Sequence, residues 1–323
     1  MVATLAELLS LRRVSPTHLE SIHNPEGMGN AANIAYGGFT LAVAINAALQ
    51  TVPAQYHLYS ALGNYLGPAF TDRSLKCSVR TIRSTKTFAT RHVEVSQKQD
   101  NGQQRLCLFL TADFHIAEPA SVFTYSRPPR MAYSSVEASV SRGENRDNLL
   151  NRGLVSPEMA QTDKVLFGLA DRYLERRSCP EGISTQNLTG LAKGGTQTSQ
   201  DHLPLSSRTS ADYFRAKHQL RTTAEQVSAL AFVMDMAISF LPLIHSGRSL
   251  TDAGAQSSLD FALRIFTNDL DLNAWHKREW STVTGGHGRT YTECQAWDDK
   301  GNMICNMTQQ GILRPKIDRS SKI

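Results

Sequence analysis

The sequence predicts an α+β protein in which a buried helix followed by antiparallel strands occurs twice. Two stretches, 36–49 and 225–241, are apolar on nearly every helical face, so each helix would be buried all round. Each is followed by segments with the alternation and β-branched residues that are typical of strands. A turn with a glycine, Gly102 or Gly301, precedes the last strand of each half. A curved sheet wrapped around its own helix, formed twice, is the economical arrangement.

In the first half, the helix YGGFTLAVAINAAL is expected at 36–49, and Pro53 follows and stops it. The strands expected after it are 58–66, 75–82, 87–95 and 105–115. Asp100-Asn101-Gly102 lies between the last two strands, and such a turn between alternating runs indicates a hairpin.

In the second half, a strand at 213–220 is expected before the helix. Thr222 or Thr223 can cap this helix, which should continue to Leu241 and stop at Pro242. The strands expected after it are 258–266, 279–284, 289–297 and 303–313.

Residues 118–205 lack this order and separate an N-terminal unit at 1–117 from a C-terminal unit at 206–323. We predict a long linker there, with a helix at 164–177 and a mobile last third rich in Gly, Ser and Thr. The alternative is that two unrelated α+β domains merely look alike.

The composition limits the classes of function. A chain of 323 residues that is 41% hydrophobic can bury a large core and suggests two domains. The net charge of +5 fits a solvated surface or attraction of a polyanion such as coenzyme phosphates. We expect no nucleic acid partner, because no arginine stripe with interleaved aromatics is present. We expect no membrane span, because the apolar runs 39–49 and 229–243 are too short. The five cysteines form no metal-binding pattern, so we expect reduced thiols and no metal site.

The chain ends in Ser321-Lys322-Ile323, which differs from the peroxisomal address Ser-Lys-Leu only in its last apolar residue. This ending predicts recognition by a peroxisomal import receptor. The alternative location is the cytoplasm, since the N-terminus does not have the order of a signal peptide.

Three polar residues stand out in apolar surroundings. Asp235 lies in the most apolar stretch of the chain, so it is either structurally paired or poised for acid/base chemistry. The nearest polar counterpart in the first half is Asn46, which makes the halves chemically different. Gln309 falls roughly opposite Thr111 of the first half, and its ordinary role would be that of a satisfied core amide. Ser258 opens a strand, and its ordinary role would be that of a turn or cap residue.

Other catalytic patterns fit less well. No Gly-x-Ser-x-Gly motif occurs, so a serine nucleophile of the α/β-hydrolase type is unsupported. Gly194-Gly195 lacks the following Lys-Ser/Thr of a phosphate loop. Asp212 and His218 have the spacing of a hydratase Asp/His pair, but both fall on a predicted strand rather than at a helix start.

Four stretches carry a family resemblance: YGGFTLAVAINAA, then NYLGPA with VRTIRSTKTFATRHVEVSQ, then MDMAISFLPL, and finally SLDFALRIF with LNAW and QQGILR. In this order they resemble the type II acyl-CoA thioesterases, the medium- and long-chain acyl-CoA hydrolases of bacteria and peroxisomes. The resemblance spans both halves and implies a double hotdog fold, two curved sheets each wrapped around a central helix. It also implies a thioester hydrolase of fatty acid metabolism.

The family's catalytic Asp, Ser/Thr and Gln carry over to Asp235, Ser258 and Gln309. The resemblance implies that Asp235 accepts a proton from water. Ser258 and Gln309 would orient that water toward the thioester carbon. No metal, cofactor or covalent intermediate is needed.

The resemblance also places Tyr36, Gly37 and Gly38 at the substrate, with backbone amides near Gly38 holding the oxyanion. Tyr59 and Leu62 stand where the family usually has histidines, so the acyl group is left open. A polyketide or other intermediate of secondary metabolism is as credible as a fatty acyl-CoA. The alternative function is a non-hydrolytic hotdog protein that binds or isomerises such an intermediate. Association into homo-oligomers is expected from the way hotdog domains pair.

Overall fold

The computed structural model describes residues 2–30, 32–248 and 252–316, and its first half has the predicted helix and strands. A short helix and two strands precede them: α1 (Leu5–Leu8), β1 (Leu11–Ser15) and β2 (His18–Ser21). The repeat itself consists of α2 (Gly37–Leu49), β3 (Tyr56–Tyr65), β4 (Lys76–Ser84), β5 (Phe88–Lys98) and β6 (Gln104–Ile116).

The second half has the same order, with extra short helices after its central helix. It begins with β9 (Thr209–Ala216), α6 (Thr223–Met234), η2 (Ile238–Phe240) and α7 (Leu241–His245). The strands that follow are β10 (Ala253–Ser258), β11 (Asp260–Ile265), β12 (His276–Gly286), β13 (Arg289–Trp297) and β14 (Met303–Pro315). Gly102 and Gly301 both have a positive φ, of 82° and 81°, as their predicted turns require.

The interval between the halves is more structured than the predicted linker with one helix. It contains β7 (Val140–Ser141), α3 (Arg142–Asn151), α4 (Pro157–Tyr173), β8 (Leu174–Ser178), α5 (Ile183–Gln186) and η1 (Leu205–Ser207). The predicted helix at 164–177 is α4, which starts earlier because Ser156 caps it and Pro157 suits a first helical turn. Its expected last residues instead form β8, which pairs with β9. The boundaries at 118 and 206 and the mobility of the last third stay predictions.

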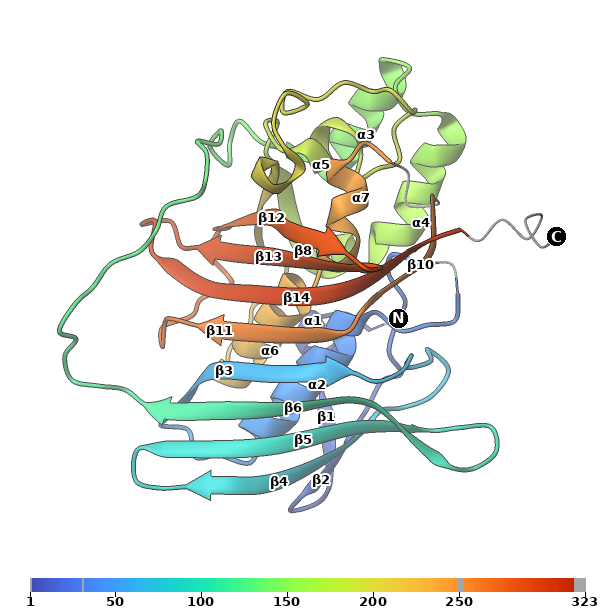
Figure 1. Ribbon diagram of the computed structural model, residues 1–323. Helices are drawn as coiled ribbons and strands as arrows, with labels where there is room; N and C mark the ends of the chain where they lie inside the picture. The colour runs from blue at the N-terminus through green and yellow to red at the C-terminus, as the bar shows by residue number, and fades with distance from the viewer. Residues whose placement is uncertain (1, 31, 249–251, 317–323) are drawn as a thin grey trace.

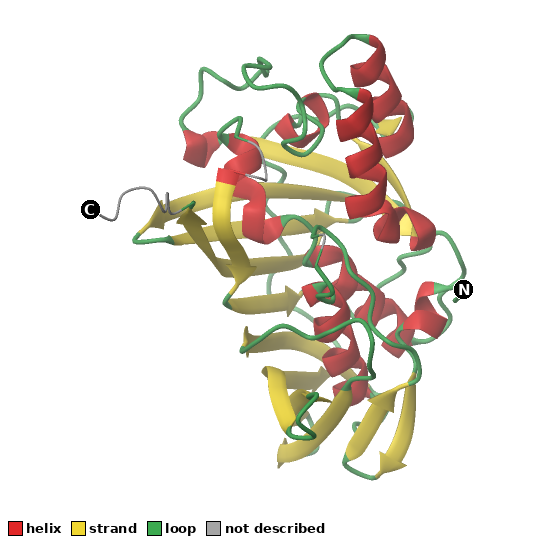
Figure 2. Ribbon diagram, turned by 90° about the vertical axis from the view of Figure 1, so that its right-hand side faces the viewer, coloured by secondary structure: helices red, strands yellow, loops and turns green. Residues whose placement is uncertain are grey.

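The described strands join into one continuous curved sheet in the order β1-β2-β4-β5-β6-β3-β11-β14-β13-β12-β9-β8-β7, with β10 also paired to β14 (Figure 1). The halves meet where β3 pairs with β11, and Leu62 lies opposite Ala262. Figure 2 shows the central helices on one side of the strands and most of the other helices at the upper end of the molecule. Figure 1 identifies the central helices as α2 and α6, behind the middle strands. This arrangement confirms the predicted α+β class. The two sheets that were predicted are joined into one, because the edge strands β3 and β11 pair with each other.

The central helices form the core because they have no polar face. Phe39 in α2 and Phe232 in α6 are fully buried, and the two helices pack against each other. Full burial of one such side chain stabilises the fold by roughly 1.5–3 kcal/mol, so the two helices hold the halves together.

The second central helix ends earlier than predicted. It stops at Met234 rather than at Leu241, and Asp235 is its C-cap. Ala237 has a φ of 66°, a left-handed conformation that cannot continue an α-helix. Pro242 lies in the first turn of α7 and so begins a helix instead of stopping one. The apolar run is therefore three short helices with a bend after Asp235.

Two strand boundaries also differ from the predictions. Ser258 is the last residue of β10, whereas the sequence predicted that it opens the following strand. Leu259 interrupts the strand because its amide donates to Gln310 O while its carbonyl accepts from the Tyr65 amide. In addition, β9 starts before the predicted position 213 and ends at Ala216.

Thr223–His245 is long and apolar enough to cross a membrane by composition, but 83% of its most apolar window is buried inside the fold. It is the core helix region just described, and the core of a soluble protein passes the same test.

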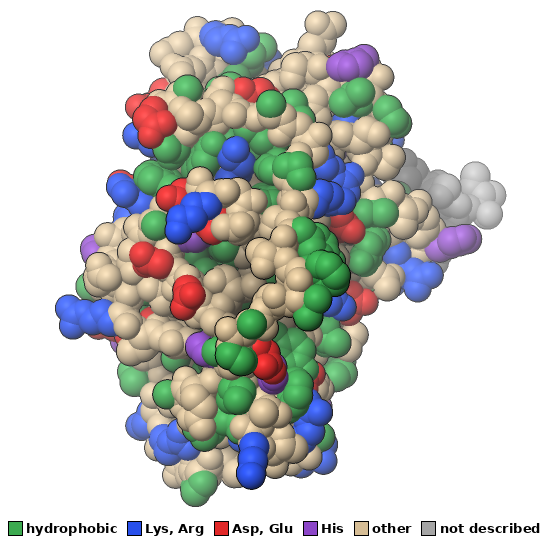
Figure 3. Space-filling model, turned by 90° about the vertical axis from the view of Figure 1, so that its left-hand side faces the viewer, with side chains coloured by type: hydrophobic (Ala, Val, Ile, Leu, Met, Phe, Trp, Pro, Cys, Tyr) green, Lys and Arg blue, Asp and Glu red, His purple; other side chains and the backbone are tan. Residues whose placement is uncertain are grey.

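The connection from β6 to β7 runs along the left side of Figure 1. Figure 3 views that side, where apolar side chains gather among charged ones. The predicted peroxisomal address, Ser321-Lys322-Ile323, lies outside the described residues.

Candidate active site

The carboxylate of Asp235 lies between the end of α6 and the start of α2. Asp235 is only 6% exposed, and the backbone amide of Gly38 donates a hydrogen bond to its carboxylate. Because the first amides of a helix lack partners within the helix, the start of α2 provides a favourable position for a negative charge.

A chain of hydrogen bonds joins the three residues predicted to be catalytic. The Ser258 Oγ donates to Gln309 Oε1 at 3.0 Å. Gln309 Nε2 in turn donates to Asp235 Oδ1. The structure therefore brings together Asp235, Ser258 and Gln309, which are far apart in the sequence and belong to three different elements.

Tyr65, which the sequence did not single out, is a fourth member of this cluster. Its hydroxyl donates to Asp235 Oδ1 at 3.0 Å. Tyr65 ends β3, so the N-terminal half also contributes a side chain to the site. The NYLGPA stretch of the resemblance contains this tyrosine and was the available signal.

Burial raises the pKa of Asp235 from the ordinary 3.8 to about 7. Desolvation is the largest cause, because an ionised carboxylate loses its water shell there. The hydrogen bonds from Gln309, Tyr65 and the Gly38 amide act in the opposite direction. A carboxylate with a pKa near neutrality can take and release a proton within one reaction cycle.

Two side chains of β12, one charged and one aromatic, fix the end of α6. Arg278 donates to the Val233 carbonyl, and Trp280 Nε1 donates to the Met236 carbonyl at 3.0 Å. Arg278 is itself fully buried and forms a paired ion bridge with Asp212, at 2.7 and 3.0 Å. These bonds satisfy carbonyls that the helix end leaves open. They hold the backbone on both sides of Asp235 in place.

The ion pair also settles the hydratase alternative. Asp212 lies on β9 and is bound to Arg278, whereas His218 follows the strand and is exposed. The two side chains predicted as a candidate Asp/His pair are therefore not brought together. Arg278 itself was missed because an arginine within a strand usually indicates a solvated face.

The sheet register places the other two residues of the cluster. Ser258 pairs with Gly311 of β14, and Gln309 pairs with Thr292 of β13. Gln309 is 1% exposed and points to the concave face. The interruption at Leu259 turns the chain so that the Ser258 hydroxyl meets this amide.

Tyr36, Gly37 and Gly38 line or touch the same site. The Tyr36 hydroxyl donates to the Phe232 carbonyl at 2.7 Å, which ties the start of α2 to α6. A Cβ on Gly37 would lie 3.1 Å from Asp235 Oδ2, and one on Gly38 would lie 2.4 Å from the Tyr36 ring. A side chain at Gly37 would therefore crowd the carboxylate, and one at Gly38 would displace the Tyr36 ring.

A cavity of about 530 Å³ opens beside Asp235. Its lining includes Tyr36, Gly37, Tyr65, Asp235 and Ser258, together with residues of α4, η2 and β10. This volume is within the range of pockets that enclose a small ligand. The cavity gives a bound molecule access to the hydrogen-bonded cluster.

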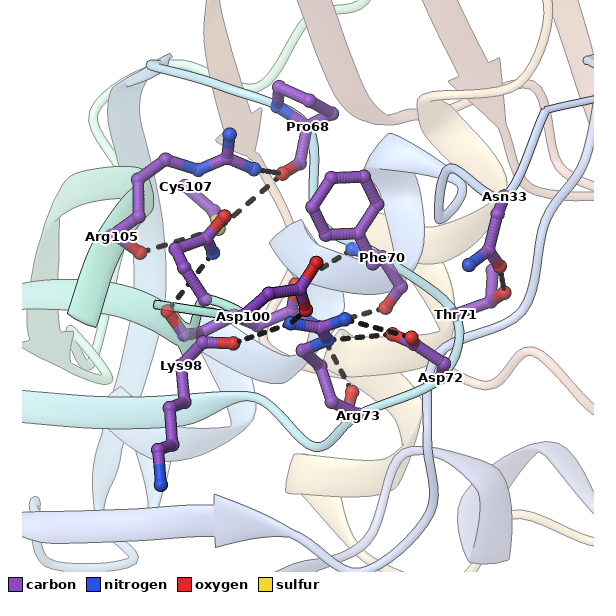
Figure 4. Close-up of polar contacts among 12 residues, drawn as sticks. Asn33, Pro68, Phe70, Thr71, Asp72, Arg73, Lys98, Asp100, Arg105 and Cys107 are labelled. Carbon is purple, nitrogen blue, oxygen red and sulfur yellow. Dashed lines mark hydrogen bonds and ion pairs between the residues drawn. The ribbon is translucent and has the colours of Figure 1, made fainter. Parts of the chain in front are cut away.

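The loop after Tyr65 forms one side of this cavity and is firmly attached to β5 and β6. Gln97 accepts from the Phe70 amide at 2.7 Å and donates to the Phe70 and Arg73 carbonyls. Arg105 donates to the Pro68 carbonyl (Figure 4). The guanidinium groups of Arg105 and Arg73 both lie over the Phe70 ring. These contacts hold residues 66–70 beside Tyr65.

Comparison with known proteins gives one family. The acyl-CoA thioesterase N-terminal domain matches residues 24–115, and the acyl-CoA thioesterase C-terminal domain matches residues 158–313. The acyl-CoA thioesterase 2 of Haemophilus influenzae is 20% identical over 312 residues, which are 96% of each chain.

Solved structures show the same fold. A tesB protein of Mycobacterium avium subspecies paratuberculosis has a TM-score of 0.69 at 15% identity, with 98% of this chain and 100% of that one covered. The acyl-CoA thioesterase II TesB2 of Mycobacterium marinum has a TM-score of 0.66 at 16% identity, with 97% and 99% covered. A hot dog fold protein of Alicyclobacillus acidocaldarius has a TM-score of 0.66 at 12% identity, with 97% and 98% covered. The double hotdog fold predicted from the resemblance is confirmed.

Proposed function

Because the chain belongs to the acyl-CoA thioesterase family and hydrolyses acyl-CoA thioesters, we propose that Asp235, Ser258 and Gln309 carry out this hydrolysis. The observation that supports this role most directly is their hydrogen-bonded chain beside the cavity. The reaction is the direct attack of an activated water on the thioester carbonyl.

Asp235 acts as the general base. With a pKa of about 7, a substantial fraction of the carboxylate is ionised at neutral pH and can accept a proton from water as it attacks. Ser258 and Gln309 hold this water through their hydroxyl and amide groups and direct it to the carbonyl carbon. A positioned general base typically contributes about 10²–10⁴-fold to a rate.

The amides at the start of α2 stabilise the oxyanion. Attack converts the carbonyl oxygen into an oxyanion. The N–H group of Gly38, in the first turn of α2, faces the Asp235 carboxylate. Once Asp235 has accepted the proton it is neutral, and it no longer competes with the oxyanion for this amide. The carbon–sulfur bond then breaks, and the proton on Asp235 passes to the departing CoA thiolate.

Single-turnover hydrolysis in ¹⁸O-labelled water tests this mechanism. Direct water attack places the label in the free acid during the first turnover. Attack by the Asp235 carboxylate would instead form an anhydride and release CoA. Water that then attacks the Asp235 carbonyl of this anhydride would leave an unlabelled enzyme oxygen in the acid. Ligand binding and thiol release, measured on a panel of acyl-CoAs of different chain lengths, test the non-hydrolytic alternative. A protein of that kind would bind ligand and release no thiol.

The location and assembly of the protein are separate proposals. The tripeptide Ser321-Lys322-Ile323 supports uptake into peroxisomes through the import receptor, because it matches two of three positions of that address. A fluorescent reporter ending in these three residues should enter peroxisomes, while one ending in Ser-Glu-Ile should stay in the cytoplasm. Light scattering on the purified chain would test the expected homo-oligomer.

A further inference from the structure

The wall of the cavity includes a polar end, which a pocket for an unsubstituted fatty acyl chain would not require. This polar end is formed by Arg142, Asn145, Arg176, Ser178, Ser184 and Thr189. All six come from the interval between the two repeats or directly follow its helices, so the interval supplies this part of the wall.

A path of contacts connects the catalytic cluster to the polar end. Phe240 follows Asp235 by five residues and lies 6.3 Å from Phe167 of α4, centroid to centroid. The Arg142 guanidinium lies 4.5 Å from the centre of the Phe167 ring, and Arg142 Nη1 donates to Thr189 Oγ1 at 3.0 Å. The cavity therefore passes from the carboxylate along an apolar stretch to buried donors.

The backbone that carries Thr189 is in an unusual conformation. Leu188 and Thr189 have φ values of 47° and 57°, and Gly190 continues this left-handed turn. Such angles are rare for a β-branched residue and are energetically unfavourable. Thr189 is only 4% exposed and lines the cavity. Strain of this kind persists where the position of a side chain matters.

The polar end also contains a donor without a partner among the described residues. Arg176 Nη2 binds Asp171 at 2.5 Å, but its Nε is buried and has no hydrogen-bond partner. A buried donor left unpaired is unfavourable, so a ligand oxygen that accepts from it would bind more tightly. The carboxylates Asp163 and Asp171 already compensate Arg142 and Arg176, so the end offers donors rather than a net charge.

We propose that the acyl group carries an acceptor oxygen, as an oxo or hydroxyl group, at the end remote from the thioester, where Arg176 and Thr189 donate to it. This inference rests on the proposed function of Asp235, Ser258 and Gln309, since it takes the acyl group to lie along this cavity. It makes Arg176 and Thr189 specificity-determining residues for oxygenated acyl groups.

The test uses pairs of acyl-CoAs of equal chain length, from hexanoyl to dodecanoyl, one unsubstituted and one with an oxo group on the penultimate carbon. For at least one length, the oxo member should have a kcat/KM at least about tenfold higher, because a site built for an oxygen discriminates against its absence. Arg176→Met should reduce this ratio toward one. The matched control is Arg215→Met, which removes an arginine paired with Glu175 on the neighbouring strand and outside the cavity lining, and should keep the ratio.

A ratio near or below one for the wild type at every length would overturn the inference while leaving thioester hydrolysis intact. A high ratio that Arg176→Met does not change would also overturn it, provided that thermal unfolding shows the variant to be folded. If no pair releases thiol at all, the proposed function fails, and this inference fails with it.

Discussion

The starts of the two central helices differ although the helices occupy equivalent places in a duplicated fold. The start of α2 lines the large cavity beside Asp235, whereas the start of α6 lines a second cavity of about 160 Å³ with Thr222, Thr223 and Gln226. The N-cap of α6 is Thr222, whose hydroxyl forms a capping box with Glu225. The N-cap of α2 is Tyr36, which makes no side-chain cap bond. The first helix start is therefore open to a ligand, and the second is closed by its own side chains.

The second cavity differs from the first in the chemistry of its lining. Its wall includes the apolar residues Leu58 and Ile265 beside the polar start of α6. No carboxylate is among the described residues that line it.

The ends of the two central helices also differ. The C-cap of α6 is Asp235, which is buried in the candidate active site. The C-cap of α2 is Gln50, which is exposed. The buried carboxylate therefore marks the end of α6 and not that of α2.

Removing the carboxylate should produce the largest effect. We expect Asp235→Asn to lower kcat/KM for acyl-CoA about a thousandfold, because an amide cannot accept the proton from water. Thiol release on the best substrate of the panel measures this. The matched control is Gln50→Asn at the equivalent helix end, which should stay within twofold of the wild type. Full activity in Asp235→Asn would show that the open helix start acts without a base.

Removing the amide that links the hydroxyl to the carboxylate should have the next largest effect. Gln309→Met keeps the length of the side chain but can neither accept from Ser258 nor donate to Asp235. We expect kcat to fall about a hundredfold, the loss typical of one positioned donor. Gln310→Met is the control, because the neighbouring side chain binds Asp260 on the other face of the strand. Equal losses in both variants would indicate a general effect on β14.

The repeat was predictable from the sequence because apolar helices and alternating strands need no tertiary information. The end of α6 was not, because the bend after Asp235 depends on Arg278 and Trp280, which come from a strand more than forty residues later. Asp235 was recognisable as a polar residue in an apolar run, whereas Tyr65 at a strand end was not. The pairing of β3 with β11, which joins the two halves, was not predictable either, because no local pattern contains it.

The buried carboxylate should also make stability depend on pH. The folded-state pKa of about 7 lies above the ordinary 3.8, so the folded protein holds this proton more tightly than the unfolded chain does. This stabilisation is present at low pH and is lost as the pH rises from about 4 to 7. Asp235→Asn carries no charge at any pH. It should therefore exceed the wild type in unfolding free energy by about 4 kcal/mol at pH 8, and by less at pH 5. Urea unfolding at both pH values measures the difference, and an equal difference at both would contradict this account.

Tyr65 should have the smallest effect, and one that depends on pH. Since the base must be ionised, wild-type kcat/KM should rise with pH to a plateau, with a midpoint of about 7. The hydrogen bond from Tyr65 lowers the pKa of Asp235, so Tyr65→Phe should move this midpoint to higher pH. We expect a loss of about fivefold at pH 7 that largely disappears by pH 9. Tyr56→Phe is the control: it removes a buried hydroxyl that donates to the Thr85 carbonyl in the N-terminal half, and should leave the midpoint unchanged. A loss in Tyr65→Phe that is the same at every pH would assign the hydroxyl to substrate binding and leave the ionisation of Asp235 to the helix start and Gln309.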